Sequence, residues 1–292
     1  MFKGAIVAIV TPIKNGKFDK KSFKNLIEFQ IKNKIEGILP CGCTGEPATL
    51  TTEEHKEVIS YTVEIVNKRV PVIAGTGSNN TKEAIELTQF AEKVGADAAL
   101  LITPYYNKPT PTGLYQHYKK VAESVSIPII LYNVPSRTGI SILPETVAKL
   151  SEIKNIVGIK EASGSLDQVS KIISICPENF TVLSGDDSLT LPIMSVGGKG
   201  VVSVAANIVP YKISEMVNSA LSGNWAEARK IHLELFPLFK ILFIETNPIP
   251  VKASLSLMGM IYPEWRLPLT PPTEENLKKI KSLLKSMGIL KK

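Results

Sequence analysis

Short apolar runs alternate with helical patterns through the first three quarters of the chain. The apolar runs are rich in β-branched residues and nearly continuous, which is typical of parallel strands buried on both faces. They lie at residues 5–10, 37–39, 70–74, 98–102, 128–132, 156–160, 181–183 and 200–202. Apolar positions recur at helical spacing between them, as at residues 22–32, 53–66, 82–94 and 114–124. Eight strands alternating with helices predict an α/β fold, a closed (β/α)8 TIM barrel rather than an open doubly wound sheet.

Several of the predicted helices carry start signals. Three of them have the spacing of a capping box, in which a polar N-cap and a Glu or Gln three residues later satisfy each other's backbone. These are Thr51 with Glu54, Asn80 with Glu83, and Ser165 with Gln168. Pro144 suits the first turn of a further helix.

The strand pattern stops near Asn224, and the remaining sequence is helical. One apolar stripe runs through Trp225, Ala228, Ile231 and Leu235, and a second through Leu277, Ile280, Leu284 and Met287. We therefore expect residues 1–223 to form a catalytic barrel and residues 224–292 to form a C-terminal helical region that packs on the barrel or on another subunit.

Composition and charge exclude several classes of protein. The 292 residues are 44% hydrophobic and 21% charged, with a net charge of +7. The basic excess is spread along the chain, which indicates solvated helix faces rather than a nucleic-acid footprint. The first apolar run breaks at Thr11-Pro12 and is too short for a signal peptide, and no run reaches membrane-spanning length. We expect a cytoplasmic protein that binds neither nucleic acid nor membrane.

The three cysteines, Cys41, Cys43 and Cys176, do not make a disulfide framework, which fits a reducing compartment. Cys41 and Cys43 would share a face of a strand, but no second pair of residues supplies the other two ligands that zinc needs. No metal site is predicted.

The most informative residue is Lys160, which ends an apolar strand pattern in the segment Asn155–Gly164. An ammonium at the mouth of a sheet is costly, and burial there lowers its pKa toward that of a neutral, nucleophilic amine. Such an amine can form a Schiff base with a carbonyl substrate. On this segment alone, a strand-end lysine with its charge in solvent is an equally valid interpretation.

Reactive residue types follow the other strands, at the end where a barrel builds its active site. The segments there are Cys41–Glu46, Gly75–Asn80, Thr103–Asn107, Tyr132–Gly139, Lys160–Gly164 and Ser184–Asp187. They would bring a lysine, tyrosines, hydroxyls and an arginine together on one face of the barrel.

Two of these segments resemble the signatures of the pyruvate-dependent class I aldolase family, also called the N-acetylneuraminate lyase family. They are the loop Gly42-Cys-Thr-Gly-Glu46, and Tyr132 followed by Gly158-Ile-Lys-Glu-Ala-Ser-Gly164. The resemblance covers essentially the whole chain. It is strongest to the dihydrodipicolinate synthase branch, through the segments Pro104–Asn107, Ser136–Gly139, Ser184–Asp187 and Asn247–Lys252.

The resemblance implies the condensation of pyruvate with L-aspartate 4-semialdehyde to 4-hydroxy-tetrahydrodipicolinate, in lysine and diaminopimelate biosynthesis. Lys160 would form the imine, and Tyr132 would act as acid and base. Tyr106 would reach into the site from the adjacent subunit as a proton relay, so we expect a homo-oligomer, a dimer or a dimer of dimers (a homotetramer). We expect no metal or organic cofactor, because the substrate imine itself is the electron sink.

Four further residues would bind the substrates. The resemblance assigns Thr44 to the pyruvate carboxylate and Arg137, a planar bidentate donor, to the carboxylate of the semialdehyde. Gly185 and Val202 would line the site. Without the resemblance, Thr44 is also interpretable as a turn residue, Arg137 as a surface residue, and the tyrosines as packing residues.

Cys43 departs from the synthase pattern, which has threonine at this position as the link between the two tyrosines. A thiol is a weak hydrogen-bonding group, although its ordinary pKa still allows proton exchange. We expect Cys43 to occupy the relay position and to make the enzyme slower than a threonine version. The alternative is a small buried residue without a role in the reaction.

Many synthases of this kind are inhibited by L-lysine between subunits. The corresponding positions here are Ala48, His55, Asn79, Glu83 and Tyr105, while Pro47 and Thr52 depart from the lysine-sensitive pattern. Glu83 could pair with an ammonium group.

Two other functions stay open at this point. A Schiff-base aldolase that cleaves a 2-keto-3-deoxy sugar acid or N-acetylneuraminate would keep Lys160 and Tyr132, but the stretch Ser136–Gly139 speaks against it. If the chain were a catalytically silent binding homologue, Cys43 would be a sign that the active site has decayed. The intact set of Lys160, Tyr132, Tyr106 and Arg137 speaks against this interpretation.

Overall fold

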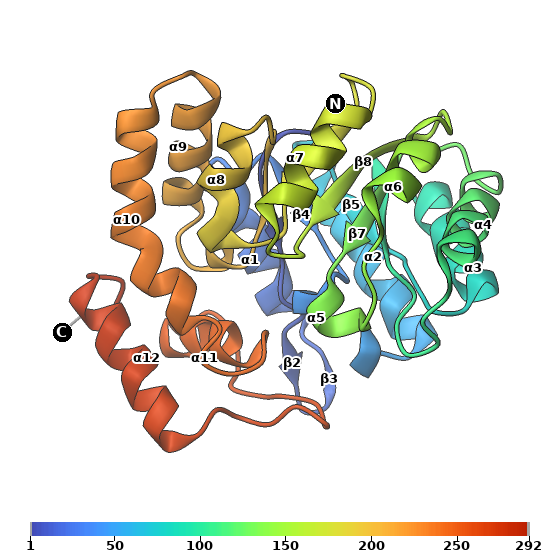
Figure 1. The fold of residues 1–292 in the computed structure, drawn as a ribbon. Helices are drawn as coiled ribbons and strands as arrows, with labels where there is room; N and C mark the ends of the chain where they lie inside the picture. Colours follow the sequence, from blue (N-terminus) through green and yellow to red (C-terminus); the bar gives the residue numbers. More distant parts are fainter. Residues whose placement is uncertain (1, 291–292) are drawn as a thin grey trace.

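Eight parallel strands form a ring at the centre of the protein in the computed structural model, which describes residues 2–290 (Figure 1). The strands follow one another around the ring in the order β4-β1-β10-β9-β8-β7-β6-β5, and a bridge between Ile38 and Val72 joins the two ends. The fold is thus the predicted (β/α)8 barrel. The strands are β1 (Gly4–Ala8), β4 (Gly37–Leu39), β5 (Ile73–Gly75), β6 (Ala98–Ile102), β7 (Ile129–Asn133), β8 (Ile156–Glu161), β9 (Thr181–Ser184) and β10 (Gly200–Ser203).

Helices connect the strands and surround the ring (Figure 1). The four helices that the sequence pattern predicted are present, with ends that differ by at most three residues. The helices of the barrel are α1 (Lys20–Lys32), α2 (Thr52–Val66), α3 (Thr81–Lys93), α4 (Pro111–Ala122), α5 (Pro135–Thr138), α6 (Pro144–Ser151), α7 (Leu166–Ile175), α8 (Thr190–Ser195) and α9 (Pro210–Leu221). Their apolar faces pack against the outside of the strands.

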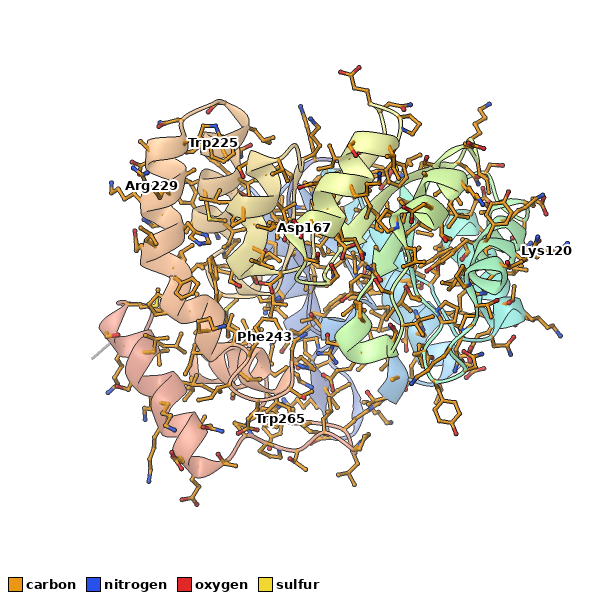
Figure 2. All side chains as sticks on the ribbon, viewed as in Figure 1. Lys120, Asp167, Trp225, Arg229, Phe243 and Trp265 are labelled. Carbon is orange, nitrogen blue, oxygen red and sulfur yellow. The ribbon has the colours of Figure 1, made fainter. Side chains whose placement is uncertain are left out.

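Three helices follow the barrel: α10 (Trp225–Ile241), α11 (Ile249–Leu257) and α12 (Glu274–Ser286). In Figure 1 they form the orange to red flank of the molecule, with α10 alongside α9. Ala228, Ile231 and Leu235 are buried as their spacing predicts, whereas Trp225, at the start of the stripe, is 41% exposed (Figure 2). We propose residues 223 and 224 as the boundary between the barrel and the helical region.

A short hairpin precedes α1 and was not predicted. Its strands are β2 (Ile13–Lys14) and β3 (Lys17–Phe18), and they pair antiparallel across Asn15 and Gly16. Both turn residues have positive φ, 54° and 74°. Asn-Gly is the preferred pair for such a turn, so the sequence did contain the signal.

The interior of the ring is filled by every second residue of the strands, because side chains alternate between the two faces of a strand. Ile6, Leu100, Ile130, Leu183 and Val202 belong to this inner cluster. The interior is therefore a packed core, and a reactive side chain can be reached only where the strands end. Among residues 2–290, no helix is both long and apolar enough to cross a membrane.

Candidate active site

Lys160 and Tyr132 are neighbours across β7 and β8, where they occupy the same register position. Both point inward, since Tyr132 belongs to the inner cluster and the Lys160 ammonium lies 4.0 Å from the centre of the Tyr132 ring. Lys160 is 4% exposed and Tyr132 is 5% exposed. The structure therefore excludes the strand-end lysine with its charge in solvent.

The surroundings of Lys160 favour the neutral amine. Burial lowers the pKa of Lys160 to about 8, and the nearby Arg137 guanidinium acts in the same direction. Cys43 and Asp187 oppose this shift but do not cancel it. A lysine with this pKa is partly uncharged near neutral pH and can attack a carbonyl carbon.

The next residue along the strand, Glu161, faces outward and is also buried. Its carboxylate accepts hydrogen bonds from the side chains of Asn133 and Gln168 and from the backbone N–H of Ser163. These contacts hold the end of β8 against β7 and α7. They fix the backbone from which Lys160 projects into the barrel.

A cavity of about 590 Å³ opens above Lys160. Its lining includes six of the predicted site residues, namely Cys43, Thr44, Tyr132, Arg137, Lys160 and Gly185. Val202 does not line it, because Val202 lies deeper in the inner cluster; Val204 lies at the cavity instead. A Cβ added at Gly185 would come within 3.0 Å of Lys160 Cε, so glycine leaves room for this lysine.

The loop after β4 brings Cys43 and Thr44 to the cavity. It forms a 3-10 turn over Cys43–Gly45. The chain can fold this closely because Gly75 has no side chain, since a Cβ there would lie 2.2 Å from the carbonyl oxygen of Cys41. The Gly75 segment is thus a tight strand-to-helix connection.

Asn247 is a site residue that the sequence analysis gave no role. Its side-chain N–H donates to the Thr44 hydroxyl at 3.0 Å, and its backbone carbonyl accepts from the Arg137 guanidinium at 2.9 Å. Asn247 is buried and lines the cavity. It belongs to the segment Asn247–Lys252, which entered the sequence analysis only as part of a resemblance.

Two aspartates after β9 belong to the site, although the sequence predicted no role for either of them. Asp186 lines the cavity, and the buried Asp187 accepts from the backbone N–H groups of Val204 and Ala205. Burial raises the pKa of Asp187 to about 6. Asp187 therefore holds the cavity-lining end of β10 in place.

Tyr132 and Cys43 are neighbours, and both line the cavity. Burial raises the pKa of Tyr132 well above its ordinary value, and the neighbouring Cys43 adds to this effect while Arg137 opposes it. Tyr132 is accordingly a protonated phenol at neutral pH. It can donate a proton, and it can accept one only if a neighbour takes its own.

Tyr106 is not among the residues that line this cavity. Its side chain is 91% exposed, and its backbone has a positive φ of 70°. In the single chain the Tyr106 ring therefore lies in solvent and not in the cavity that holds Lys160.

A second cavity of about 400 Å³ lies beside the first. Four of the five positions predicted for a lysine site line it: Ala48, His55, Glu83 and Tyr105. The fifth, Asn79, donates its side-chain N–H to the carbonyl of Tyr105. His55 is buried and its ring Nε2 lies 2.7 Å from the Gly75 carbonyl, so it is not the partly exposed residue typical of a capped helix.

Glu83 accepts a short hydrogen bond from the Ser78 hydroxyl. Cys43 and Arg137 line both cavities, which therefore share a wall. Among residues 2–290, no three His, Cys, Asp or Glu side chains are grouped so that they could hold a metal ion.

Comparison with known proteins gives a consistent result. The family model described as "Dihydrodipicolinate synthetase family" matches residues 1–287. The 4-hydroxy-tetrahydrodipicolinate synthase of Syntrophus aciditrophicus is 58% identical over 290 residues, which are 99% of this chain and 100% of that protein. The crystal structure of dihydrodipicolinate synthase from Aquifex aeolicus has a TM-score of 0.98 and 52% identity, and covers 99% of each chain.

Two further solved structures contain small molecules. A synthase from Acinetobacter baumannii, described as complexed with pyruvate, has 47% identity and a TM-score of 0.97, and the match covers 99% of this chain and 100% of that one. A synthase from Cyanidioschyzon merolae, described with lysine bound, has 41% identity and a TM-score of 0.96, with 99% of each chain covered.

Proposed function

The chain belongs to the dihydrodipicolinate synthetase family, and from this premise we propose how its residues condense pyruvate with L-aspartate 4-semialdehyde to 4-hydroxy-tetrahydrodipicolinate. This reaction serves lysine and diaminopimelate biosynthesis. The enzyme is a lyase of the class I aldolase type. The arrangement of Lys160 and Tyr132 in one closed barrel carries the proposal for the site.

The neutral amine of Lys160 attacks the ketone carbon of pyruvate, and loss of water gives a protonated imine. The positive nitrogen withdraws electrons from the neighbouring methyl group, so a methyl proton leaves and an enamine forms. The enamine carbon then adds to the aldehyde carbon of the second substrate. Attack of that substrate's amine on the imine carbon closes the ring and releases Lys160.

Tyr132 moves protons during these steps. Its burial and the position of its ring beside the Lys160 ammonium place Tyr132 next to the point where the imine forms and water leaves. Because its raised pKa makes the phenolate costly, Tyr132 needs a partner that exchanges protons with it. Cys43, which lies next to Tyr132 in the lining of the cavity, is that partner in this chain.

The two substrate carboxylates bind to two residues that Asn247 links, Thr44 and Arg137. Thr44, oriented by Asn247, receives the carboxylate of pyruvate. Arg137 receives the carboxylate of the semialdehyde, since its guanidinium lies at the cavity and is fixed through the Asn247 carbonyl. Gly185 leaves the space for the bound keto acid, while Val202 supports the site from the layer below.

The relay is completed between subunits. Tyr106 is almost fully exposed in one chain, which is the property expected of a side chain that enters a neighbour's active site. We infer a homodimer as the smallest active unit, alone or as half of a homotetramer, in the cytoplasm. L-Lysine would bind in the second cavity and inhibit the enzyme. Among the described residues, Glu46 and Glu83 are the two acidic side chains that line this cavity. Glu83 would pair with the ammonium group of the ligand.

Trapping of the imine tests the function. Borohydride reduction with pyruvate, followed by peptide mass mapping, is expected to place the reduced adduct on Lys160 and to leave Lys160→Arg unlabelled. An adduct elsewhere, or none, would overturn the mechanism. Formation of 4-hydroxy-tetrahydrodipicolinate with the semialdehyde, without release of pyruvate from keto-deoxy sugar acids, separates the synthase from a sugar-acid aldolase.

A further inference from the structure

A buried ion pair joins the active-site loop to the C-terminal helices. The ammonium of Lys252, on α11, lies 2.6 Å from the carboxylate Oε1 of Glu46, which follows the 3-10 turn in the loop after β4. Both side chains are almost completely buried, at 1% and 3% exposure. The Lys252 ammonium also lies 5.9 Å from the centre of the Trp265 ring, in the segment between α11 and α12 (Figure 2).

Such a pair is a poor way to gain stability. Removing two charges from water costs about as much as their attraction returns, and apolar replacements are often neutral. Burial lowers the pKa of Lys252, and Glu46 opposes that shift. The other carboxylate oxygen of Glu46, Oε2, has no hydrogen-bond partner among the described residues. The Lys252 ammonium and the Glu46 carboxylate are therefore each stabilised in the interior by the charge of the other.

The backbone at Glu46 is in an unfavourable conformation. Its φ and ψ, 56° and 43°, lie in the left-handed region, which costs a residue with a side chain of this size roughly 1 kcal/mol or more. This conformation ends the turn that carries Cys43 and Thr44, because the Glu46 N–H donates to the Cys43 carbonyl at 3.2 Å. The ion pair fixes the side chain of the residue that shapes the turn.

One C-terminal segment holds both ends of this turn. Asn247 contacts Thr44, and Lys252, five residues later, contacts Glu46. The distance in sequence between the partners exceeds 200 residues in both cases. Lys252 itself does not line the cavity.

We propose that the Lys252–Glu46 ion pair is a positioning device that sets the Thr44 hydroxyl for the carboxylate of the keto acid. The inference rests on the proposed function, since it concerns how the same site binds pyruvate. Lys252 and Glu46 are positioning residues, not catalytic ones. Loss of the pair displaces Thr44 and weakens pyruvate binding, while Lys160 keeps its reactivity once pyruvate is bound.

The test measures imine formation as a function of pyruvate concentration in the purified full-length enzyme. The double variant Glu46→Gln/Lys252→Met removes both charges and leaves neither buried alone. We expect the half-saturating pyruvate concentration to rise about tenfold or more, because small misplacements of binding groups have effects of this size. The plateau of labelling on Lys160 is expected to stay at the parent level.

The matched control is Glu54→Gln/Arg266→Met. This pair also joins the C-terminal region to the barrel, with 2.6 Å between guanidinium and carboxylate, but it does not contact the residues of the 43–46 turn. Its half-saturating concentration is expected to stay within about twofold of the parent, since Arg266 acts on Glu46 and Lys252 only through longer-range charge and its hydrogen bonds go to Glu54, Thr49 and Gly16. If Glu46→Gln/Lys252→Met does not fold, the single variant Glu46→Asp, which keeps both charges and shortens the side chain by one methylene group, is measured in the same way.

The outcomes are distinct. An unchanged half-saturating concentration in the Glu46 variants, with the parent labelled on Lys160, overturns the positioning role and leaves the proposed function intact. An equal rise in the Glu54 control also overturns it, because the effect would then come from any loosening of the C-terminal region. A parent enzyme without an adduct on Lys160 overturns the proposed function itself.

Discussion

At the scale of the residue, the site depends on taking one lysine out of water without giving it a carboxylate partner. Lys160 is as buried as Lys252, but Lys252 has Glu46 at 2.6 Å, while Lys160 faces an aromatic ring and a nearby guanidinium. The first arrangement keeps a lysine charged for a structural purpose. The second favours its neutral form and makes it a nucleophile.

The pKa of Lys160 predicts how imine formation depends on pH. With a pKa of about 8, the neutral fraction at pH 7 is about one in ten, against about one in several thousand for an ordinary lysine. The neutral fraction rises as pH rises toward the pKa and levels off above it. The initial rate of imine formation should therefore increase about tenfold from pH 6 to pH 7 and flatten above pH 8. Rapid-quench trapping with borohydride measures this, and a rate that falls as pH rises would contradict it.

Cys43 allows a second prediction at this scale. Its thiol lies beside Tyr132 where a hydroxyl would be the stronger hydrogen-bonding group. We expect Cys43→Thr to raise kcat by a few-fold, because proton exchange with Tyr132 becomes easier, and to leave the half-saturating pyruvate concentration unchanged. Steady-state kinetics decide this, with Cys43→Ala as the control that lowers kcat. A kcat for Cys43→Thr at or below that of the parent would remove Cys43 from the relay.

At the scale of the element, the sequence predicted helix caps correctly where the two hydrogen-bonding residues lie within the same turn. The Thr51–Glu54 capping box is present, with both of its hydrogen bonds. Asn80 and Ser165 cap their helices as N-caps, but their boxes do not close. Glu83 accepts from Ser78 instead, and Gln168 reaches Glu161 on another element.

The capping box of α2 can be tested directly. Thr51→Ala removes the acceptor for the Glu54 N–H, so we expect the free energy of unfolding to fall by about 1 kcal/mol. Thr51→Ser keeps the hydroxyl and is the matched control, with a change of only a few tenths of a kcal/mol. Urea unfolding followed by circular dichroism gives both values. Equal losses in the two variants would show that the cap contributes nothing.

The strands and the order of elements were predictable from the sequence because each strand is a short apolar run between helices of ordinary length. The boundaries of the elements were less predictable. The strand expected to start at residue 70, for example, begins at Ile73. Pro71 and Val72 lie where the ring closes: the Pro71 carbonyl accepts from the Ile38 N–H, and Val72 forms a single bridge with Ile38, which is too short a pairing to extend the strand. The hairpin around Asn15 and Gly16 was missed because its strands have two residues each.

At the scale of the whole molecule, the C-terminal helices complete the barrel's active site. Asn247 and Lys252 reach the loop after β4 across more than 200 residues of sequence. No local pattern reports such a contact, so the sequence predicted Lys160, Tyr132, Thr44 and Arg137 at the site but gave Asn247 no role. Phe243 and the next three residues, through Thr246, also line the cavity, so the C-terminal region forms one wall of the site.

The exposed Tyr106 leads to a prediction about the assembly. If Tyr106 acts on the partner's Lys160, Lys160→Met and Tyr106→Phe should each be nearly inactive alone, because every site then lacks one of the two groups. In dimers formed by refolding an equal mixture, a subunit with Lys160 meets a partner with Tyr106 half of the time. About a quarter of all sites are then complete, so about a quarter of the parent activity should return.

A Tyr106 that acts within its own chain predicts no recovery, since each subunit would still lack one of its own groups. Activity measured before and after mixing, with dimer content followed by analytical ultracentrifugation, therefore distinguishes a site shared between subunits from two independent barrels.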